Sequence, residues 1–397
     1  MIFDETSLYN IKSELDGTRY SLFELATWKN GIAFKKNDFS ETGRPVIKIA
    51  ELNNGINSNT AFTQGDYGEE VFVRRDDLLF SWSGNPQTSI DVFRYRLQDG
   101  WLNQHIFKVS ANESLVNKDY LYYILKFLKP HFTQIATNKQ TTGLGHVTIA
   151  DLKRMSLVVP ANEVQERIVS VLKAVDDKIE VNSNINENLQ QQAAALFSSL
   201  YDRSNAEVRF TNLIQILGGG TPKTGENNYW NGNIAFFTPK DVGTPYTLIT
   251  EKSITEEGLS HCNSRLYPVN TVFVTARGTV GKVGMSGIPM AMNQSCYALV
   301  GKETHQLLVY FYTLKAVDRL KHKASGAVFD AITTRDFESE QIMKLSADDA
   351  KAFLCIAAPM FQKVLNNCIE NLRLSTLRDS LLPKLMSGEL DVSDLDL

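Results

Sequence analysis

The chain has 397 residues, which is long enough for two or three domains. Its hydrophobic fraction of 43% and charged fraction of 22% are ordinary for a soluble protein, and a net charge of −4 argues mildly against a nucleic-acid binder. No long charge run occurs, so any phosphate contact must come from a folded face rather than from a basic tail. Four cysteines without C-x-x-C spacing indicate reduced thiols, and no apolar run approaches the ~20 residues of a membrane span, so we expect a cytoplasmic protein without membrane contact.

The first part of the chain predicts an α+β body. Residues 1–20 carry few signals and are expected to form a short element against that body. Short β-rich runs punctuated by Gly, Asn and Asp predict strands at 46–49, 70–73, 78–82, 105–109 and 155–159. Apolar spacing predicts a helix over 118–129, and residues 140–146 form a polar loop.

A long helix is predicted from Asn162 to Leu200. Asn162 and Gln165 have the spacing of a capping box, and no Pro or Gly interrupts the segment. At 1.5 Å per residue the helix would be roughly 55–60 Å long. Its apolar stripe is too narrow for a globular core and predicts one partner helix; the stripe comprises Ile168, Val171, Val175, Ile179, Ile185, Leu189 and Leu196.

The same order of elements restarts near Val208, so the chain contains an internal repeat. Gly31 corresponds to Gly219, and the segment 148–152 corresponds to 333–337. Further matches pair 49–52 with 239–242, 77–84 with 271–278, and 102–104 with 292–294. Residues 206–346 are therefore expected to repeat the fold of the first body.

A second long helix is predicted from Asp348 to Met386, with a kink or restart at Pro359 and Pro383 and a stop at Gly388. Because it follows the second body, it would run antiparallel to the first long helix. One or two of the mid-helix asparagines at 182, 184, 186 and 188 would face the seam and fix its register. The predicted fold is α+β: two similar bodies separated by two long helices in an antiparallel coiled coil with pseudo-two-fold symmetry.

Two related bodies held apart by a stiff helix pair suit duplex DNA, because a dimeric reader contacts two half-sites at a spacing that its scaffold sets. The bodies differ in sequence, so their half-sites should differ as well.

Several short motifs recur along the chain at characteristic places: Gly218 to Thr224 with Tyr229-Trp230, Phe237 to Asp241, Ala276 to Val283, Met292 to Cys296, Phe80 to Gly84, Leu102 to His105, Pro160 to Ile168, and Leu382 to Leu390. Through these motifs the chain resembles one family, the specificity (S) subunits of Type I restriction–modification systems. The resemblance implies target recognition domains at 1–157 and 206–346 and conserved-region helices at 158–205 and 347–397. It implies a non-catalytic subunit that binds double-stranded DNA, two methyltransferase subunits and ATP-dependent restriction subunits. No cofactor is expected in this chain; S-adenosylmethionine, ATP and Mg would bind the partner subunits.

Side chains that the two bodies do not share are the candidates for reading sequence, since shared ones build the common fold. Asn103-Gln104 and Asn293-Gln294 recur in both bodies, which favours a structural role. Polar and basic loop residues can contact phosphates and base edges. The candidates are Lys35, Lys36, Ser83, Asn85, Gln87, Lys139, Thr141, Thr142, His146, Thr221, Lys223, Thr224, Lys240, Arg277, Thr279, Lys282, Lys321 and Lys323.

Other functions are open to the same residues. Arg277 to Lys282 invites comparison with a P-loop, but Ala276 and Val283 occupy places where that motif needs Gly and Ser or Thr. Trp82 and Trp230 could stack on bases, but buried packing is the favoured explanation for each. The alternatives are a stand-alone two-domain DNA-binding regulator or other binding module without methyltransferase partners, and a self-sufficient enzyme, which would need a cofactor or metal site.

Overall fold

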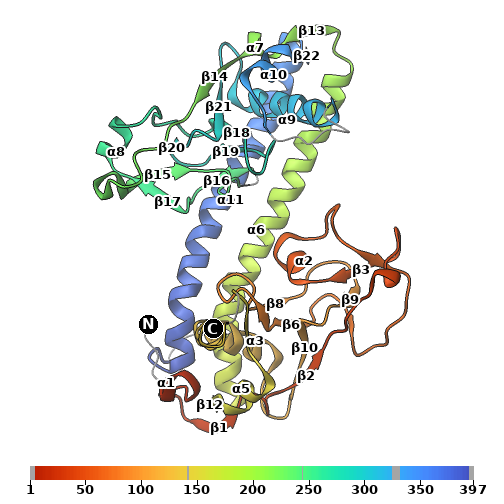
Figure 1. Ribbon diagram of the computed structural model, residues 1–397, viewed down its shortest axis with the longest axis vertical. Helices are drawn as coiled ribbons and strands as arrows, with labels where there is room; N and C mark the ends of the chain where they lie inside the picture. Colours follow the sequence, from red (N-terminus) through yellow and green to blue (C-terminus); the bar gives the residue numbers. More distant parts are fainter. Residues whose placement is uncertain (1–4, 141–142, 244, 324–330, 393–397) are drawn as a thin grey trace. The chain divides into compact units, whose positions relative to one another are not determined.

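The computed structural model describes residues 5–140, 143–243, 245–323 and 331–392. The chain forms two compact units, Met1–Asp177 with Ser375–Leu397 and Lys178–Leu374 (Figure 1). Each unit contains one α+β body together with a part of both long helices. The division therefore runs through the helices rather than between helices and bodies.

Unit 1 is built on two small sheets. The first has the order β2-β10-β6-β8, from Ala26–Asn30, Ile106–Ala111, Leu78–Ser81 and Asp91–Arg94. The second has the order β4-β3-β9-β5, from Phe62–Thr63, Arg44–Ile47, Gly100–Leu102 and Phe72–Val73, and its β3–β9 pair is parallel. Two further pairs are β1 (Gly17–Ser21) with β12 (Ser156–Pro160) and β7 (Ser83–Gly84) with β11 (Gly145–His146). The helices are α1 (Glu5–Tyr9), α2 (Ile49–Asn54), α3 (Lys118–Phe127), α4 (Lys129–Asn138) and α5 (Ile149–Arg154), with the 3-10 turn η1 at Lys36–Asp38.

Two expectations for this unit are wrong in detail. The predicted helix at 118–129 is two helices, because Pro130 stands in the first turn of α4 and marks a new start. Ile49 begins α2 rather than ending a strand, since the Glu51 carboxylate accepts the backbone N–H of Lys48 at 3.1 Å and caps the helix. The N-terminal element does pack on the body, with Leu8 and Ile11 buried in its core.

Unit 2 repeats this plan. Its larger sheet has the order β14-β21-β18-β19-β16, from Ile214–Gly218, Cys296–Gly301, Val272–Thr275, Val283–Ser286 and Tyr246–Thr247. The smaller sheet is β17-β15-β20, from Lys252–Ile254, Trp230–Phe237 and Met290–Met292, and β13 (Ala206–Arg209) pairs with β22 (Gln341–Lys344). The helices are α7 (Phe210–Leu213), α8 (Glu256–Ser260), α9 (Gln306–Lys323) and α10 (Thr334–Ser339), with η2 at Asn227–Tyr229.

Equivalent close contacts confirm the internal repeat. A Cβ on Gly31 would lie 2.2 Å from the carbonyl oxygen of Asn103, and a Cβ on Gly219 would lie 2.2 Å from that of Asn293. Both glycines are thus required by the same close backbone approach. The helices α5 and α10 also begin alike, because Thr148 and Thr333 each donate hydroxyl and backbone hydrogen bonds to an aspartate three residues later.

The long helices are α6 (Asn162–Asp202) and α11 (Ala347–Ser387). Contacts within each unit show that they run antiparallel: Asp176 meets Arg378 at 2.9 Å in unit 1, and Asn186 meets Asn367 at 2.8 Å in unit 2. A kink or a restart was expected at each of the two prolines, and the restart is wrong, since α11 continues through both. Pro359 and Pro383 are exposed, so the carbonyl groups that lose a helical partner face solvent.

The expected capping box at the start of α6 is also wrong. Asn162 is already helical and donates to Glu166 at 2.7 Å. The buried Gln165 side chain instead accepts from the backbone N–H of Asn117 at 2.8 Å, at the start of α3, and donates to the carbonyl of Pro160 at 2.9 Å. This glutamine therefore ties the start of the long helix to the body.

Asparagines fill the middle of the helix seam, as expected for two of the four candidates. Asn182 and Asn186 are 1% and 7% exposed, whereas Asn184 and Asn188 face solvent. The Asn182 amide donates to Asn371 at 2.9 Å. Ile185, predicted to lie in the seam, is exposed instead, because the facing positions are taken by its asparagine neighbour and Leu189.

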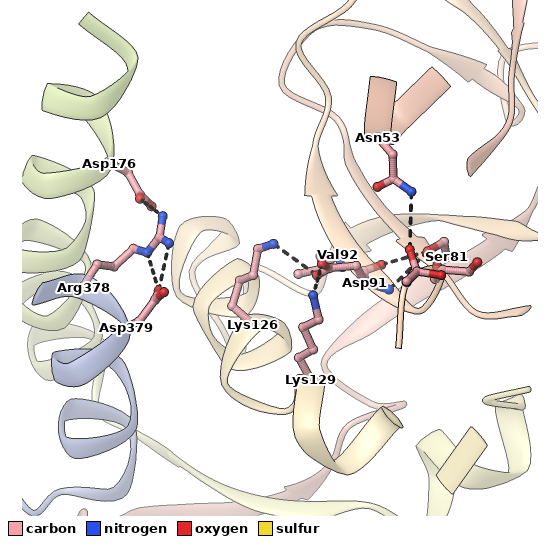
Figure 2. Close-up of polar contacts among 11 residues, drawn as sticks. Asn53, Ser81, Asp91, Val92, Lys126, Lys129, Asp176, Arg378 and Asp379 are labelled. Atoms are coloured by element: carbon pink, nitrogen blue, oxygen red, sulfur yellow. Dashed lines mark hydrogen bonds and ion pairs between the residues drawn. The ribbon is translucent and has the colours of Figure 1, made fainter. Parts of the chain in front are cut away.

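The ends of the long helices also form part of the hydrophobic cores of the bodies. The narrow apolar stripe in the sequence predicted only a partner helix and not this packing. Ile168 and Leu385 lie in the core of unit 1, and Phe197 and Phe361 lie in that of unit 2. By length and composition α11 is apolar enough to cross a membrane, but part of its apolar surface is buried in these cores. In unit 1, the α3 residue Tyr123 donates to Asp176 at 2.9 Å, and this aspartate also accepts from Arg378 (Figure 2).

Candidate nucleic-acid interface

The two units share one backbone arrangement at the ends of their central strands. In unit 1, Trp82 directly follows β6. Its backbone N–H donates to the His105 carbonyl at 3.2 Å, and its backbone carbonyl accepts from the Val147 N–H at 2.9 Å. In unit 2, Ala276 after β18 makes the same two bonds with Ser295 and Ile332, at 2.8 and 3.0 Å. We call these places the strand-end edges of units 1 and 2. They are equivalent in topology and differ in side chains.

The strand-end edge of unit 1 consists of aromatic rings and polar side chains, and their hydrogen bonds among the described residues involve no Lys, Arg, Asp or Glu. Trp82 stacks on Phe107 with ring centroids 5.6 Å apart, and its indole N–H donates to Asn30 at 2.9 Å. The hydroxyl of the buried Ser83 lies 2.9 Å from Nδ1 of His146. The structure therefore brings two predicted residues, Ser83 and His146, into direct contact.

The loop that follows Ser83 is held by hydrogen bonds between its own residues. The side-chain oxygen of Asn85 accepts the backbone N–H groups of Gln87 at 2.9 Å and Thr88 at 3.3 Å. Asn85 thus shapes the turn, and Gln87 is exposed on it.

The strand-end edge of unit 2 gathers basic and hydroxyl side chains. Arg277, Thr279 and Lys282 lie in the loop between β18 and β19 and are exposed. The Thr279 hydroxyl donates to the Pro239 carbonyl at 3.2 Å, and a Cβ on Gly281 would lie 2.6 Å from Cε of Lys321. The structure therefore places the Lys321 side chain, near the end of α9, against the same loop. Thr221 joins this edge by donating a hydrogen bond to Gln294.

The remaining predicted residues lie elsewhere. Lys35 and Lys36 are exposed around η1, and Lys223 and Thr224 are exposed before η2. The exposed Lys240 lies 3.4 Å from Glu251. Thr141 and Thr142 lie outside the described residues.

Two predicted lysines neutralise buried carboxylates. Lys139 pairs with Asp151, which is 1% exposed, and Lys323 pairs with Glu340, which is 0% exposed, at 2.6 Å. Burial opposes ionisation of Asp151, but hydrogen bonds from Lys139, Thr148 and Tyr9 outweigh it and hold the pKa of this carboxyl below its usual range. These ion pairs give both lysines a structural role.

Two charged features of unit 1 were not predicted from the sequence. The guanidinium groups of Arg44 and Arg74 each lie 4.4 Å from the ring centroid of Phe72, and only Arg74 is close to Phe72 in the chain. Asp91 binds both Lys126 and Lys129 (Figure 2). Burial would raise the pKa of Asp91, but the two lysines outweigh this and lower it. No local sequence pattern indicates the contacts of Arg44 with Phe72 or of Asp91 with its two lysines, because the partners are 28 to 38 residues apart.

Comparisons with known proteins agree with this repeated architecture. A family model described as the Type I restriction modification DNA specificity domain matches residues 16–191 and 204–344. The Type I restriction enzyme HindI specificity subunit of Haemophilus influenzae is 22% identical over 408 residues, covering 80% of this chain and 87% of the relative. The EcoR124I/EcoR124II specificity subunit of Escherichia coli is 28% identical over 217 residues, or 51% of this chain and 52% of the relative. A crystal structure of a Type-I restriction-modification system S subunit from M. genitalium covers 95% of this chain and 97% of its own, with a TM-score of 0.55 and 16% identity, which is a likeness in fold.

Proposed function

The chain belongs to the family of Type I restriction modification DNA specificity proteins, and from this premise we propose that each α+β domain recognises one half of a bipartite, asymmetric target in duplex DNA. The chain is the DNA specificity subunit of a Type I restriction–modification system. Its own role is recognition rather than catalysis.

One observation carries this proposal: the two strand-end edges have the same backbone and different side chains. Unit 1 presents the half-buried Trp82 and His146, the latter bound to the buried Ser83, whereas unit 2 presents the exposed Arg277, Lys282 and Lys321. A shared backbone can approach DNA in the same way at both half-sites. Different side chains then read different bases, because each base pair offers its own pattern of donors and acceptors in the major groove.

The long helices supply the second part of the proposal. They hold two methyltransferase subunits, and the assembly recruits ATP-dependent restriction subunits. S-adenosylmethionine, ATP and Mg would then be bound by those partners, in the cytoplasm. A stand-alone regulator is not favoured, because the family match spans both domains and the first long helix up to residue 191.

Co-expression with the methyltransferase subunits tests the proposal. We expect a stable assembly with two methyltransferase chains, and adenine methylation at a two-part sequence motif that disappears when this chain is omitted. Purification of the chain without partners, together with an unchanged methylation pattern after its deletion, would overturn the proposal and favour the stand-alone regulator.

A further inference from the structure

The loop between β18 and β19 presents backbone donors at its tip. In the described part of the chain, the N–H groups of Gly278, Thr279 and Val280 have no acceptor, whereas the N–H of Gly281 is bound to the Thr275 carbonyl at 2.9 Å. Gly278 and Gly281 have φ of +81° and +73°, and residues 277–281 form a bend followed by a turn. Successive backbone N–H groups in a turn can face one concavity, and such concavities bind anions.

Three cations surround this tip. Arg277, Lys282 and Lys321 are exposed, and none has an ion-pair partner among the described residues. A Cβ on Gly281 would lie 3.4 Å from Nζ of Lys321, so this ammonium group lies beside the loop. Positive side chains beside free N–H groups raise the attraction for an anion.

The loop is held in place by contacts that leave its tip free. The Thr275 hydroxyl donates to the Thr279 carbonyl and accepts the N–H of Lys282 at 2.9 Å. The Thr279 hydroxyl donates to the Pro239 carbonyl. These anchors use hydroxyl and carbonyl groups and leave the three N–H groups at the tip available to a ligand.

The equivalent loop of unit 1 lacks this arrangement. Ser81 corresponds to Thr275 and donates to the Ser89 carbonyl, but Asn85 takes up the N–H groups of Gln87, Thr88 and Ser89. The segment from Trp82 to Ile90 contains no Lys or Arg. Among the described residues, the combination of free donors and cations therefore belongs to the strand-end edge of unit 2.

We propose that the loop Arg277–Lys282, together with Lys321, binds a backbone phosphate of the DNA beside the second half-site, and that the first domain has no counterpart. The inference rests on the proposed function and specifies its contacts. Phosphate contacts position a protein on DNA without reading its sequence. The two domains would thus differ in how strongly salt weakens their hold on DNA.

Fluorescence anisotropy of the full assembly on a mixed-sequence duplex tests this site, because a phosphate contact does not require the target sequence. The double variant Lys282→Gln/Lys321→Gln should reduce the slope of log affinity against log salt by about 0.9, the value for one phosphate. Lys302→Gln/Lys344→Gln is the matched control in the same unit. Lys302 follows the opposite end of β21 from Ser295, and the slope should not change.

A glycine pair tests the backbone donors. Neither Gly278 nor Gly225 has an atom within 4 Å of an added Cβ, but only Gly278 has positive φ. Gly278→Ala should distort the tip and weaken binding by about tenfold, since a left-handed non-glycine residue is unfavourable. Gly225→Ala should bind as the wild type does.

The outcomes separate the two proposals. If the wild-type assembly does not bind even a duplex that carries its own methylated two-part motif, the proposed function fails. If it binds and Lys282→Gln/Lys321→Gln keeps the wild-type salt slope, only the phosphate site is refuted. Saturable binding of ATP that the same double variant abolishes would also refute it, because the site would then serve a free nucleotide.

Discussion

The hydrogen bond between Asn367 and Asn186 can be removed from either side of the helix seam. Asn367 Nδ2 donates to Asn186 Oδ1 at 2.8 Å, and the two residues are 0% and 7% exposed. Asn186→Leu leaves the Asn367 amide without its acceptor, and Asn367→Leu leaves the Asn186 oxygen without its donor. The double leucine variant leaves neither group unpaired.

The size of the effect follows from these contacts. A buried polar group left without a partner costs about 1–3 kcal/mol. A buried leucine contributes about 1.5–3 kcal/mol, which overpacking of about 1–3 kcal/mol largely offsets. Each single variant carries the cost of one unpaired group and the double variant carries neither cost, so the double variant should be more stable than the sum of the two single effects predicts by about 2–6 kcal/mol.

Hydrogen exchange read by mass spectrometry can measure this coupling in the full chain. Peptides covering residues 178–190 and 364–374 report the local opening free energy for the wild type, both singles and the double. The exposed Asn184→Leu is the control and should change it by less than about 0.5 kcal/mol. Strict additivity of the two single variants would refute a buried asparagine pair in the seam.

Three further perturbations test other parts of the structure. Arg378→Ala removes the partner of Asp176, whose side chain is 24% exposed, and should lower the free energy of unfolding in thermal melts by about 1–3 kcal/mol. The control Lys173→Ala, which breaks an exposed ion pair, should lower it by less than about 0.5 kcal/mol in the same melts. Asp91→Asn should destabilise the chain at pH 7, and this loss of stability should shrink as the pH falls below 3.8. The reason is that the pKa of Asp91 is lowered in the folded chain, so its ionised form stabilises the fold above that pH and this stabilisation is lost below it. A loss in melting temperature that is equal at pH 3 and pH 7 would contradict this. Removal of one heptad from each long helix, at 181–187 and 366–372, should change the gap in the methylated motif and leave both half-sites intact, and methylome sequencing that finds altered half-sites with an unaltered gap would refute the helices as spacers.

The repeat could be predicted because its signals are local and occur twice. Gly31 and Gly219 mark the same close approach, and the Thr-x-x-Asp caps at 148 and 333 begin equivalent helices. The first long helix was recognisable from its uninterrupted heptad-like stripe, and one or two seam asparagines were expected from their positions in the middle of that helix.

What the sequence did not reveal depends on contacts between distant segments. The seam register places Asn186 inward and Ile185 outward, a choice set by the facing residues of α11. The Gln165 side chain accepts a hydrogen bond from the backbone N–H of Asn117 and does not cap the start of its own helix. Among the predicted interface residues, Lys139 and Lys323 could not be told from free lysines, since their carboxylate partners are 12 and 17 residues away.

Methylome sequencing after replacement of one domain tests the central claim most directly. Residues 206–346 would be exchanged for the second domain of a relative, with both long helices kept. Two independent recognition domains predict that one half of the methylated motif changes while the other half stays as in the wild type. A motif in which both halves change, or neither does, would contradict the account.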